Sequence, residues 1–454
     1  MKRLLTVALA VLFVSSMFGV AVAERTALSI DGSIEIMGVS EQNIATVLGD
    51  RGNDNRVEQK VNLNVDADMT DNVTGHIGLE IAGDWAGANS DINPAAAIGP
   101  IDRQRAALAI DEAYITVDEL IIEQLSITAG VQTIEYSLRD DGNAMFLSVA
   151  ETGAFKATLD YDPLYVDLSI VKIDETRATN IADAANVAEL ASDVDLYALA
   201  VEYYLENESK VQFILFALNS ERQEISLTEY SIGLDYNFSD DLELFAQIGG
   251  QGGNFGTTGL ADIDSNEMAY NLGLEYTFSN VNLTPYVGLS YQSFGGENVT
   301  ATGQDESWVN MGDIDETMIM EADRDLRDHN RGLPKLLTTN YNALRIVGGC
   351  VIDEKTTLDG KIVFFSVDDD QANCGAAGGV NLAADYLTTK GENDIGTEID
   401  VKLTHQLTDD LEVGLGIGYV AAGDAIDIAG SGGVAAAQDD DALIMVAANA
   451  VLTF

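Results

Sequence analysis

The chain of 454 residues has little cysteine, proline, histidine and positive charge. Two cysteines, Cys350 and Cys374, are too few for a disulfide framework. The three histidines, His76, His329 and His405, are not paired with a recognisable nucleophile motif, and no phosphate-binding loop or zinc motif occurs, so no catalysis is expected. Only 23 lysines and arginines stand against 75 aspartates and glutamates, a net charge of −52. This charge excludes nucleic acid as a partner, because the phosphates would be repelled.

Long apolar runs are also missing, except at the N-terminus. There, two basic residues precede the apolar stretch Leu4–Val14, and Ala21-Val22-Ala23 forms a small-residue cleavage site. These features predict a signal peptide over residues 1–23 and an exported chain of one domain over residues 24–454. No later segment approaches the roughly 20 apolar residues that a membrane helix needs. The exported chain is therefore either a soluble protein outside the cytoplasm or a membrane β-barrel.

What the exported chain does have is a repeated pair of strands with alternating apolar residues. In the clearest copy, apolar residues alternate with polar ones over 230–238 and 242–248, on either side of the turn Ser239-Asp240-Asp241. Such alternation gives each strand one wet face and one apolar face. Further tight turns are expected at Thr70-Asp71-Asn72, around Asp118–Gln124, at Asp162-Pro163, at Asn207-Glu208-Ser209, at Ser279-Asn280, near Asp353–Thr356 and at Thr408-Asp409-Asp410.

The C-terminus fits the same pattern. Residues 442–454 read ALIMVAANAVLTF, with an apolar residue at every second position counted back from Phe454, which is how outer-membrane barrels end. Eight hairpins, a first strand near Leu28–Met37 and this last strand predict an all-β, transmembrane antiparallel barrel of about 18 strands. Sixteen is the alternative count, because 105–117 and 151–161 alternate poorly. Aromatic residues cluster beside the tight turns, which predicts an aromatic girdle at one membrane interface.

In its export signal, hairpins, Asp-Asp-Leu-Glu turns and terminal Thr-Phe, the chain resembles the general porins of Gram-negative outer membranes. The resemblance implies a water-filled pore in the outer membrane, often as a trimer, with short periplasmic turns and long extracellular loops. It also implies that one loop folds inward, and the third loop, Tyr136–Ser148, is the candidate by chain position. This loop holds Arg139, Asp140 and Asp141, and a basic group facing acids across a constriction orients polar solutes. An ordinary surface position for Arg139 is the alternative.

Several other charged residues are candidates for the pore. Those opposite the apolar positions of their strands are expected to line the lumen, namely Lys60, Glu80, Asp235, Glu243, Lys361, Glu398, Asp400 and Lys402. Arg105 at a strand start is a further constriction candidate, as are Arg324, Arg327 and Arg331 in the longest loop, Gly295–Thr339. For these loop arginines, a salt-bridged surface helix is the favoured interpretation. Two acidic runs are weak candidates for loosely bound Ca²⁺ or Mg²⁺, with a solvated charge patch as the alternative, namely Asp368, Asp369, Asp370, Asp439, Asp440 and Asp441.

Together these features predict an outer-membrane porin without a resident cofactor. Small hydrophilic solutes or ions would diffuse passively through it, and the surplus of carboxylates predicts a preference for cations. Two alternatives remain open from the sequence. One is a barrel that serves as a scaffold or sleeve for a partner protein such as an electron-transfer subunit. The other is a surface or structural β-protein whose acidity reflects a saline habitat.

Overall fold

The structure is a computed structural model that describes twelve stretches of the chain. These are residues 27–43, 54–84, 107–139, 143–175, 193–220, 225–255, 263–296, 308–312, 317–321, 340–368, 393–423 and 442–454. The predicted signal peptide lies outside the described residues. Within those residues, no helix has the length and apolar character needed to cross a membrane.

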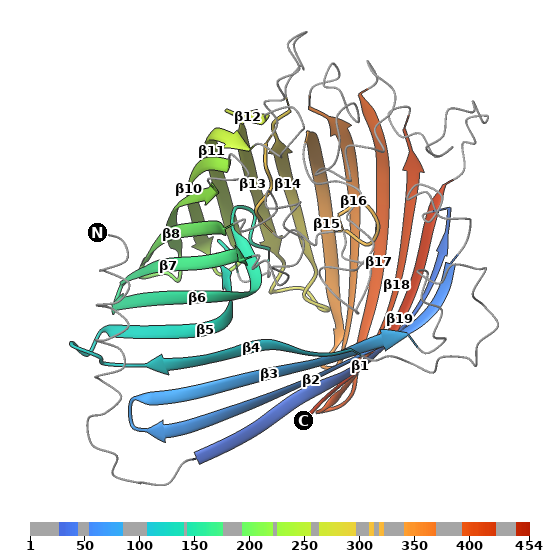
Figure 1. Cartoon of the computed structure of the whole chain (residues 1–454). Helices are drawn as coiled ribbons and strands as arrows, with labels where there is room; N and C mark the ends of the chain where they lie inside the picture. The colour runs from blue at the N-terminus through green and yellow to red at the C-terminus, as the bar shows by residue number, and fades with distance from the viewer. Residues whose placement is uncertain are drawn as a thin grey trace, which may run out of the picture.

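The described strands form one antiparallel sheet that closes on itself (Figure 1). Each long strand pairs with its neighbours in the sequence, and β1 also pairs with β19, so that eighteen long strands make a closed barrel. The three-residue β12 only extends the pairing of β11. The strands are β1 (Ala27–Gln42), β2 (Asp54–Thr70), β3 (Val73–Asp84), β4 (Ala107–Val117), β5 (Leu125–Glu135), β6 (Ser148–Tyr161), β7 (Leu164–Glu175), β8 (Asp193–Tyr204), β9 (Lys210–Ser220), β10 (Ile225–Ser239), β11 (Leu242–Phe255), β12 (Ile263–Ser265), β13 (Met268–Thr277), β14 (Tyr286–Phe294), β15 (Tyr341–Asp353), β16 (Thr356–Val367), β17 (Asp394–Thr408), β18 (Leu411–Ala422) and β19 (Leu443–Thr453).

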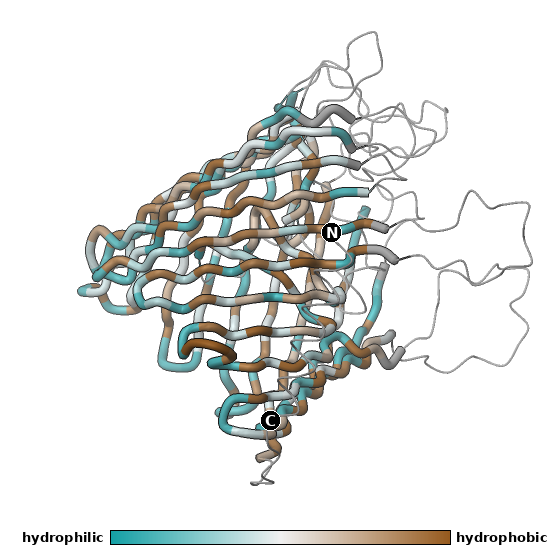
Figure 2. The backbone as a smooth tube through the Cα atoms, turned by 60° about the vertical axis from the view of Figure 1, so that its left-hand side comes forward, coloured by the Kyte–Doolittle hydropathy of each residue, from teal (hydrophilic) through white to brown (hydrophobic). Residues whose placement is uncertain are grey.

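The alternation in the sequence becomes an apolar outside and a more polar inside. On β10, Tyr230, Ile232 and Leu234 are exposed, whereas Glu229 and Ser231, which alternate with them, are buried. The same alternation of hydrophobic and hydrophilic residues follows the strands around the barrel in Figure 2. Since neighbouring residues of a strand point to opposite faces, the exposed apolar row faces outward and the polar row faces the lumen.

The eight predicted connections all occur and all lie at one end of the barrel, called here the turn end, although the one at Ser279-Asn280 is wider than predicted. Both the start of β1 and the end of β19 lie at this end as well, as an even strand count requires. Exposed aromatic residues gather there, among them Tyr161, Phe238 and Phe454. The opposite end, where the longer connections lie, is called the loop end.

The strand count of 18 is confirmed, because the two poorly alternating segments do form β4 and β6. The expected start of β14 at Val281 was wrong, since that strand begins at Tyr286. Pro285 has no N–H for a sheet, and Leu283 and Thr284 have positive φ angles of 73° and 39°, so residues 278–285 make a wider turn. The short connection between β9 and β10 at the loop end was not predicted.

The apolar core of the protein lies inside the barrel towards the loop end. Inward residues of many strands contribute to it, including Phe216, Phe294 and Phe365. The remaining members come from described segments outside the strands, notably Phe146 and Trp308. A porin-type wall alone has no such core, so these segments must fill part of the lumen.

Candidate functional site

The third loop folds into the barrel and packs on the inner wall of β9–β13. Its residues Leu138, Phe146 and Leu147 are almost fully buried. Leu138 lies over Gly233 of β10 and Phe146 lies over Gly249 of β11, where a Cβ would come within 2.7 Å and 2.2 Å of the respective side chain. Glycine at these inward positions therefore makes room for the infolded segment.

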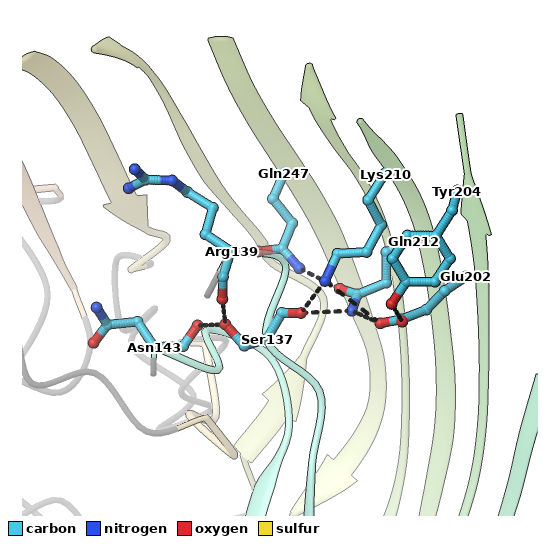
Figure 3. A network of polar contacts seen from close by, with 8 residues as sticks. All are labelled: Ser137, Arg139, Asn143, Glu202, Tyr204, Lys210, Gln212 and Gln247. Atoms are coloured by element: carbon cyan, nitrogen blue, oxygen red, sulfur yellow. Dashed lines mark hydrogen bonds and ion pairs between the residues drawn. The ribbon is translucent and has the colours of Figure 1, made fainter. Parts of the chain in front are cut away.

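Polar side chains of the wall hold the backbone of this segment (Figure 3). Lys210 Nζ and Gln212 Nε2 of β9 both donate to the carbonyl oxygen of Ser137, each at 3.0 Å. Gln212 also donates to Glu202 Oε1 at 2.8 Å and accepts from Gln247 Nε2 at 3.3 Å. The Ser137 hydroxyl closes the tip of the loop by donating to the carbonyl of Asn143 at 2.9 Å.

Arg139 reaches from the segment towards β11 and β13. Its Nε donates to Glu243 Oε1 at 2.6 Å, and its guanidinium lies 3.8 Å from Glu275 Oε2. The guanidinium carbon is also 4.4 Å from the centroid of the Phe245 ring. The side chains of Arg139, Glu243 and Glu275 remain 24%, 26% and 30% exposed, so this cluster faces an open part of the lumen. Asp235 pairs in register with Phe245 and adds a carboxylate beside the cluster.

A second charged wall lies across the barrel on β2–β4. Lys60 Nζ contacts Glu80 Oε2 at 2.5 Å, and His76 Nδ1 lies 2.6 Å from Asp66 Oδ1. The His76 ring is stacked on Tyr114 and its Nε2 lies 3.5 Å from Glu112 Oε2. About half of the strands separate β3 from β11 in either direction around the ring, so these residues face the Arg139 cluster across the lumen.

Two further segments inside the barrel come from the longest loop. Residues 308–312 pack on the infolded third loop, with Trp308 5.7 Å from Phe146 between ring centroids. Gln251 of β11 both donates to and accepts from the backbone of Val309, at 2.5 Å and 2.8 Å. Residues 317–321 lie instead on the wall of β15–β18, where Glu398 and Asp400 accept hydrogen bonds from their backbone.

The structure thus divides the predicted lumen residues into two groups. Lys60, Glu80, Asp235, Glu243, Lys361 and Lys402 occupy inward positions of their strands, and Lys361 and Lys402 stand opposite Asp400 and Asp359 in the register. Glu398 and Asp400 also point inward, but they are covered by residues 317–321.

Phe454, the predicted C-terminal barrel residue, continues the sheet, since it exchanges two backbone hydrogen bonds of 3.0 Å with Gly32 of β1.

Other predicted residues lie outside the described part of the chain, namely Asp140, Asp141, Arg105, Arg324, Arg327, Arg331, Asp369, Asp370, Asp439, Asp440 and Asp441. Asp368 is described, and its carboxylate accepts from Gly296 N and Asn342 Nδ2, both at 3.2 Å. No group of three metal-binding side chains occurs among the residues that the structure describes.

The sequence reasoning missed the residues that fasten the loops, namely Lys210, Gln212, Gln251, Glu321 and Arg345. A signal was present for the two glutamines, because Gln212 and Gln251 stand at inward positions of alternating strands. Long polar side chains that are buried inside a barrel require a partner, and infolded backbone provides one.

Comparisons with known proteins agree with the barrel. The family model described as "Alginate export" matches residues 221–435. The chain is similar in structure to Pseudomonas aeruginosa OccK8 (OprE), with 11% identity, 94% of this chain and 98% of that chain covered and a TM-score of 0.56. Acinetobacter baumannii OccAB3 gives 9% identity, 94% and 99% coverage and a TM-score of 0.55. A BenF-like porin from Pseudomonas fluorescens gives 10% identity, with 94% of this chain and 98% of that chain covered and a TM-score of 0.53.

The comparison with curated proteins gives no match. At 9–11% identity the structural likeness shows the fold, and it extends over nearly the whole of each chain. The chain therefore has the 18-stranded barrel fold of outer-membrane porins, and its lumen is the place where any function of that fold would reside.

Proposed function

We propose that the protein is an outer-membrane channel through which small hydrophilic solutes and ions diffuse passively. The observation that carries the proposal is a closed barrel, apolar outside, whose inner wall keeps solvent-exposed charged side chains on two opposite sides. A hydrated solute can replace part of its hydration shell with contacts to these side chains, whereas a sealed apolar interior would provide no such contacts. The predicted signal peptide supports a location in the outer membrane.

A preference for cations is part of the proposal. Three carboxylates (Asp235, Glu243 and Glu275) stand around Arg139, and the only further cation beside them among the described residues is Lys210, which pairs in register with Asp235. On the opposite wall, Asp66 and Glu112 flank a single histidine. Both clusters therefore carry more negative than positive charge, which lowers the energy of a cation in the lumen and raises that of an anion.

Export of an anionic polysaccharide is a second candidate, because the alginate-export family model matches residues 221–435. The excess of carboxylates on both exposed clusters disfavours it, since a polyuronate would be repelled. The sleeve for a partner protein is disfavoured by a different observation. Segments of the chain itself, 136–139, 143–147, 308–312 and 317–321, already occupy the interior near the loop end.

Proteoliposomes test the proposal directly. Vesicles that contain the folded protein should swell when diluted into isotonic small sugars or amino acids, with rates that fall as solute size rises. Vesicles with heat-denatured protein are the control. Block of this flux by added alginate oligomers would favour the polysaccharide candidate, and no flux at all would contradict a diffusion channel. Analytical ultracentrifugation of the detergent-solubilised protein tests the trimer that the porin resemblance implies.

A further inference from the structure

Residues 317–321 form no strand or helix, yet four of their backbone N–H groups are hydrogen-bonded. Met318 N donates to Asp400 Oδ2 at 3.1 Å, and Ile319 N and Met320 N donate to the two oxygens of Glu398 at 2.7 Å and 3.1 Å. Glu321 N donates to the Thr317 hydroxyl at 3.0 Å. Four successive N–H groups thus have side-chain acceptors, three of them from β17.

The two acceptors are poorly suited to any other role. Glu398 is 0% exposed and Asp400 is 7% exposed, so neither carboxylate meets solutes directly. Buried carboxylates are costly unless hydrogen bonds compensate them, and here the compensation comes mainly from the backbone of a loop. Glu398 and Asp400 therefore hold residues 317–321 in place, and these residues in turn shield the two carboxylates from solvent.

Side-chain packing and a buried ion pair complete the attachment. Met318 lies over Gly416 and Gly418 of β18, where a Cβ would come within 2.7 Å and 3.0 Å of it. Glu321 pairs with Arg345 of β15, and both side chains are essentially inaccessible. The segment is thus fixed to β15, β17 and β18.

The same connection between β14 and β15 is fixed a second time on another wall. Residues 308–312 are bound to β11 through Gln251, five long strands away from β17 around the ring. The two described parts of this connection, residues 308–312 and 317–321, are therefore held on different walls of the barrel.

We infer that Glu398 and Asp400 are positioning residues that hold residues 317–321 inside the lumen and thereby limit the size of the solutes that pass. The inference rests on the proposed function, because a size limit has meaning only in a channel. Loss of both carboxylates frees this end of the connection and widens the passage.

The test is single-channel recording of the full-length protein carrying Glu398→Gln and Asp400→Asn together. Release of the segment raises the KCl conductance about twofold and admits larger sugars in swelling assays. The electrostatic effect alone has the opposite sign, because removal of carboxylates lowers cation conductance. The matched control is Glu412→Gln, an inward carboxylate at the turn end of β18, which should not raise conductance. A double variant with conductance at or below that of the wild type overturns the inference.

A second readout does not depend on conductance. Met320 is 1% exposed, so Met320→Cys in a background with Cys350 and Cys374 changed to Ser should react slowly with a water-soluble maleimide. Adding Glu398→Gln and Asp400→Asn should accelerate labelling at least tenfold, while Glu412→Gln should not. Faster labelling without conductance in any variant would retain the attachment and reject the channel. Unchanged labelling in a protein that conducts would do the reverse. The heat-dependent gel mobility of each variant shows that its barrel is folded.

Discussion

Arg139 Nε lies 2.6 Å from Glu243 Oε1, which joins the tip of the infolded third loop to the inner wall of β11. The guanidinium also lies over Phe245, so its position is fixed by charge and by a cation–π contact together. Glu243 and Glu275 both stand within 4 Å of Arg139, and Lys210 pairs in register with the neighbouring Asp235.

Replacement of Arg139 with Gln should make the channel more cation-selective. One unit charge at 4 Å in water is worth about 1 kcal/mol, so the ratio of cation to anion permeability should rise about two- to fivefold. The reversal potential under a KCl gradient measures this ratio. Arg139→Lys is the control that keeps the charge, and it should stay near the wild type. An unchanged ratio in Arg139→Gln would mean that ions do not pass this cluster.

The acidic partners predict the opposite shift. Glu243→Gln together with Glu275→Gln leaves Asp235 as the remaining carboxylate of the cluster beside Arg139 and Lys210, and removes the negative excess of the cluster. The cation preference should fall to a similar degree, and it should fall less in high salt, where charges are screened. Reversal potentials measured at 0.1 M and 1 M KCl test both statements. A rise in cation preference would refute the assignment.

Glycine 249 should be essential for seating the third loop. A Cβ at this position would lie 2.2 Å from Phe146 Cε1, so Gly249→Ala must displace either the ring or the strand. Overpacking of this kind costs about 1–3 kcal/mol. The temperature at which the folded gel band disappears should fall. Gly252→Ala on the same strand is the matched control, because a Cβ there meets nothing within 4 Å, and equal stability of the two variants would contradict the packing described.

Arg345 should matter for stability rather than for selectivity. It is 0% exposed and pairs with Glu321, so Arg345→Met leaves a buried carboxylate without this partner. Removing one partner of a buried ion pair should lower the free energy of unfolding by about 3–5 kcal/mol. The double change Glu321→Gln and Arg345→Met should recover part of the loss. Thermal melts in detergent measure both, and a single variant as stable as the wild type would show that the pair contributes little.

The barrel itself could be predicted from the sequence because its rule is local. Alternation over 230–238 and 242–248, separated by an Asp-rich turn, specifies a hairpin without reference to any other part of the chain. The same rule failed at Val281, where the alternation continued through Pro285, a residue that cannot donate to a sheet. The alternation pattern predicts which face of a strand is apolar and where the turns lie, but it does not detect backbone constraints such as a proline.

The interior could be predicted only in part, because it depends on contacts between residues far apart in the chain. The resemblance to porins indicated that the third loop folds inward, and the structure places residues 136–139 and 143–147 inside the barrel. The alternation predicted that Glu398 and Asp400 point into the lumen, but it did not predict that residues 317–321 cover them. Their partners, Met318 to Met320, are some 80 residues away and donate through backbone groups that every residue has. Only a three-dimensional structure reveals such a contact.

The central claim is that this barrel is an open, cation-preferring pore, and single-channel recording in a planar bilayer tests it most directly. The detergent-purified, folded protein should insert in discrete conductance steps, and a KCl gradient should give a reversal potential of the sign expected for cation selectivity. A reversal potential of the opposite sign would retain the pore and reject the role given to the carboxylates. Folded protein that never conducts would contradict the account as a whole.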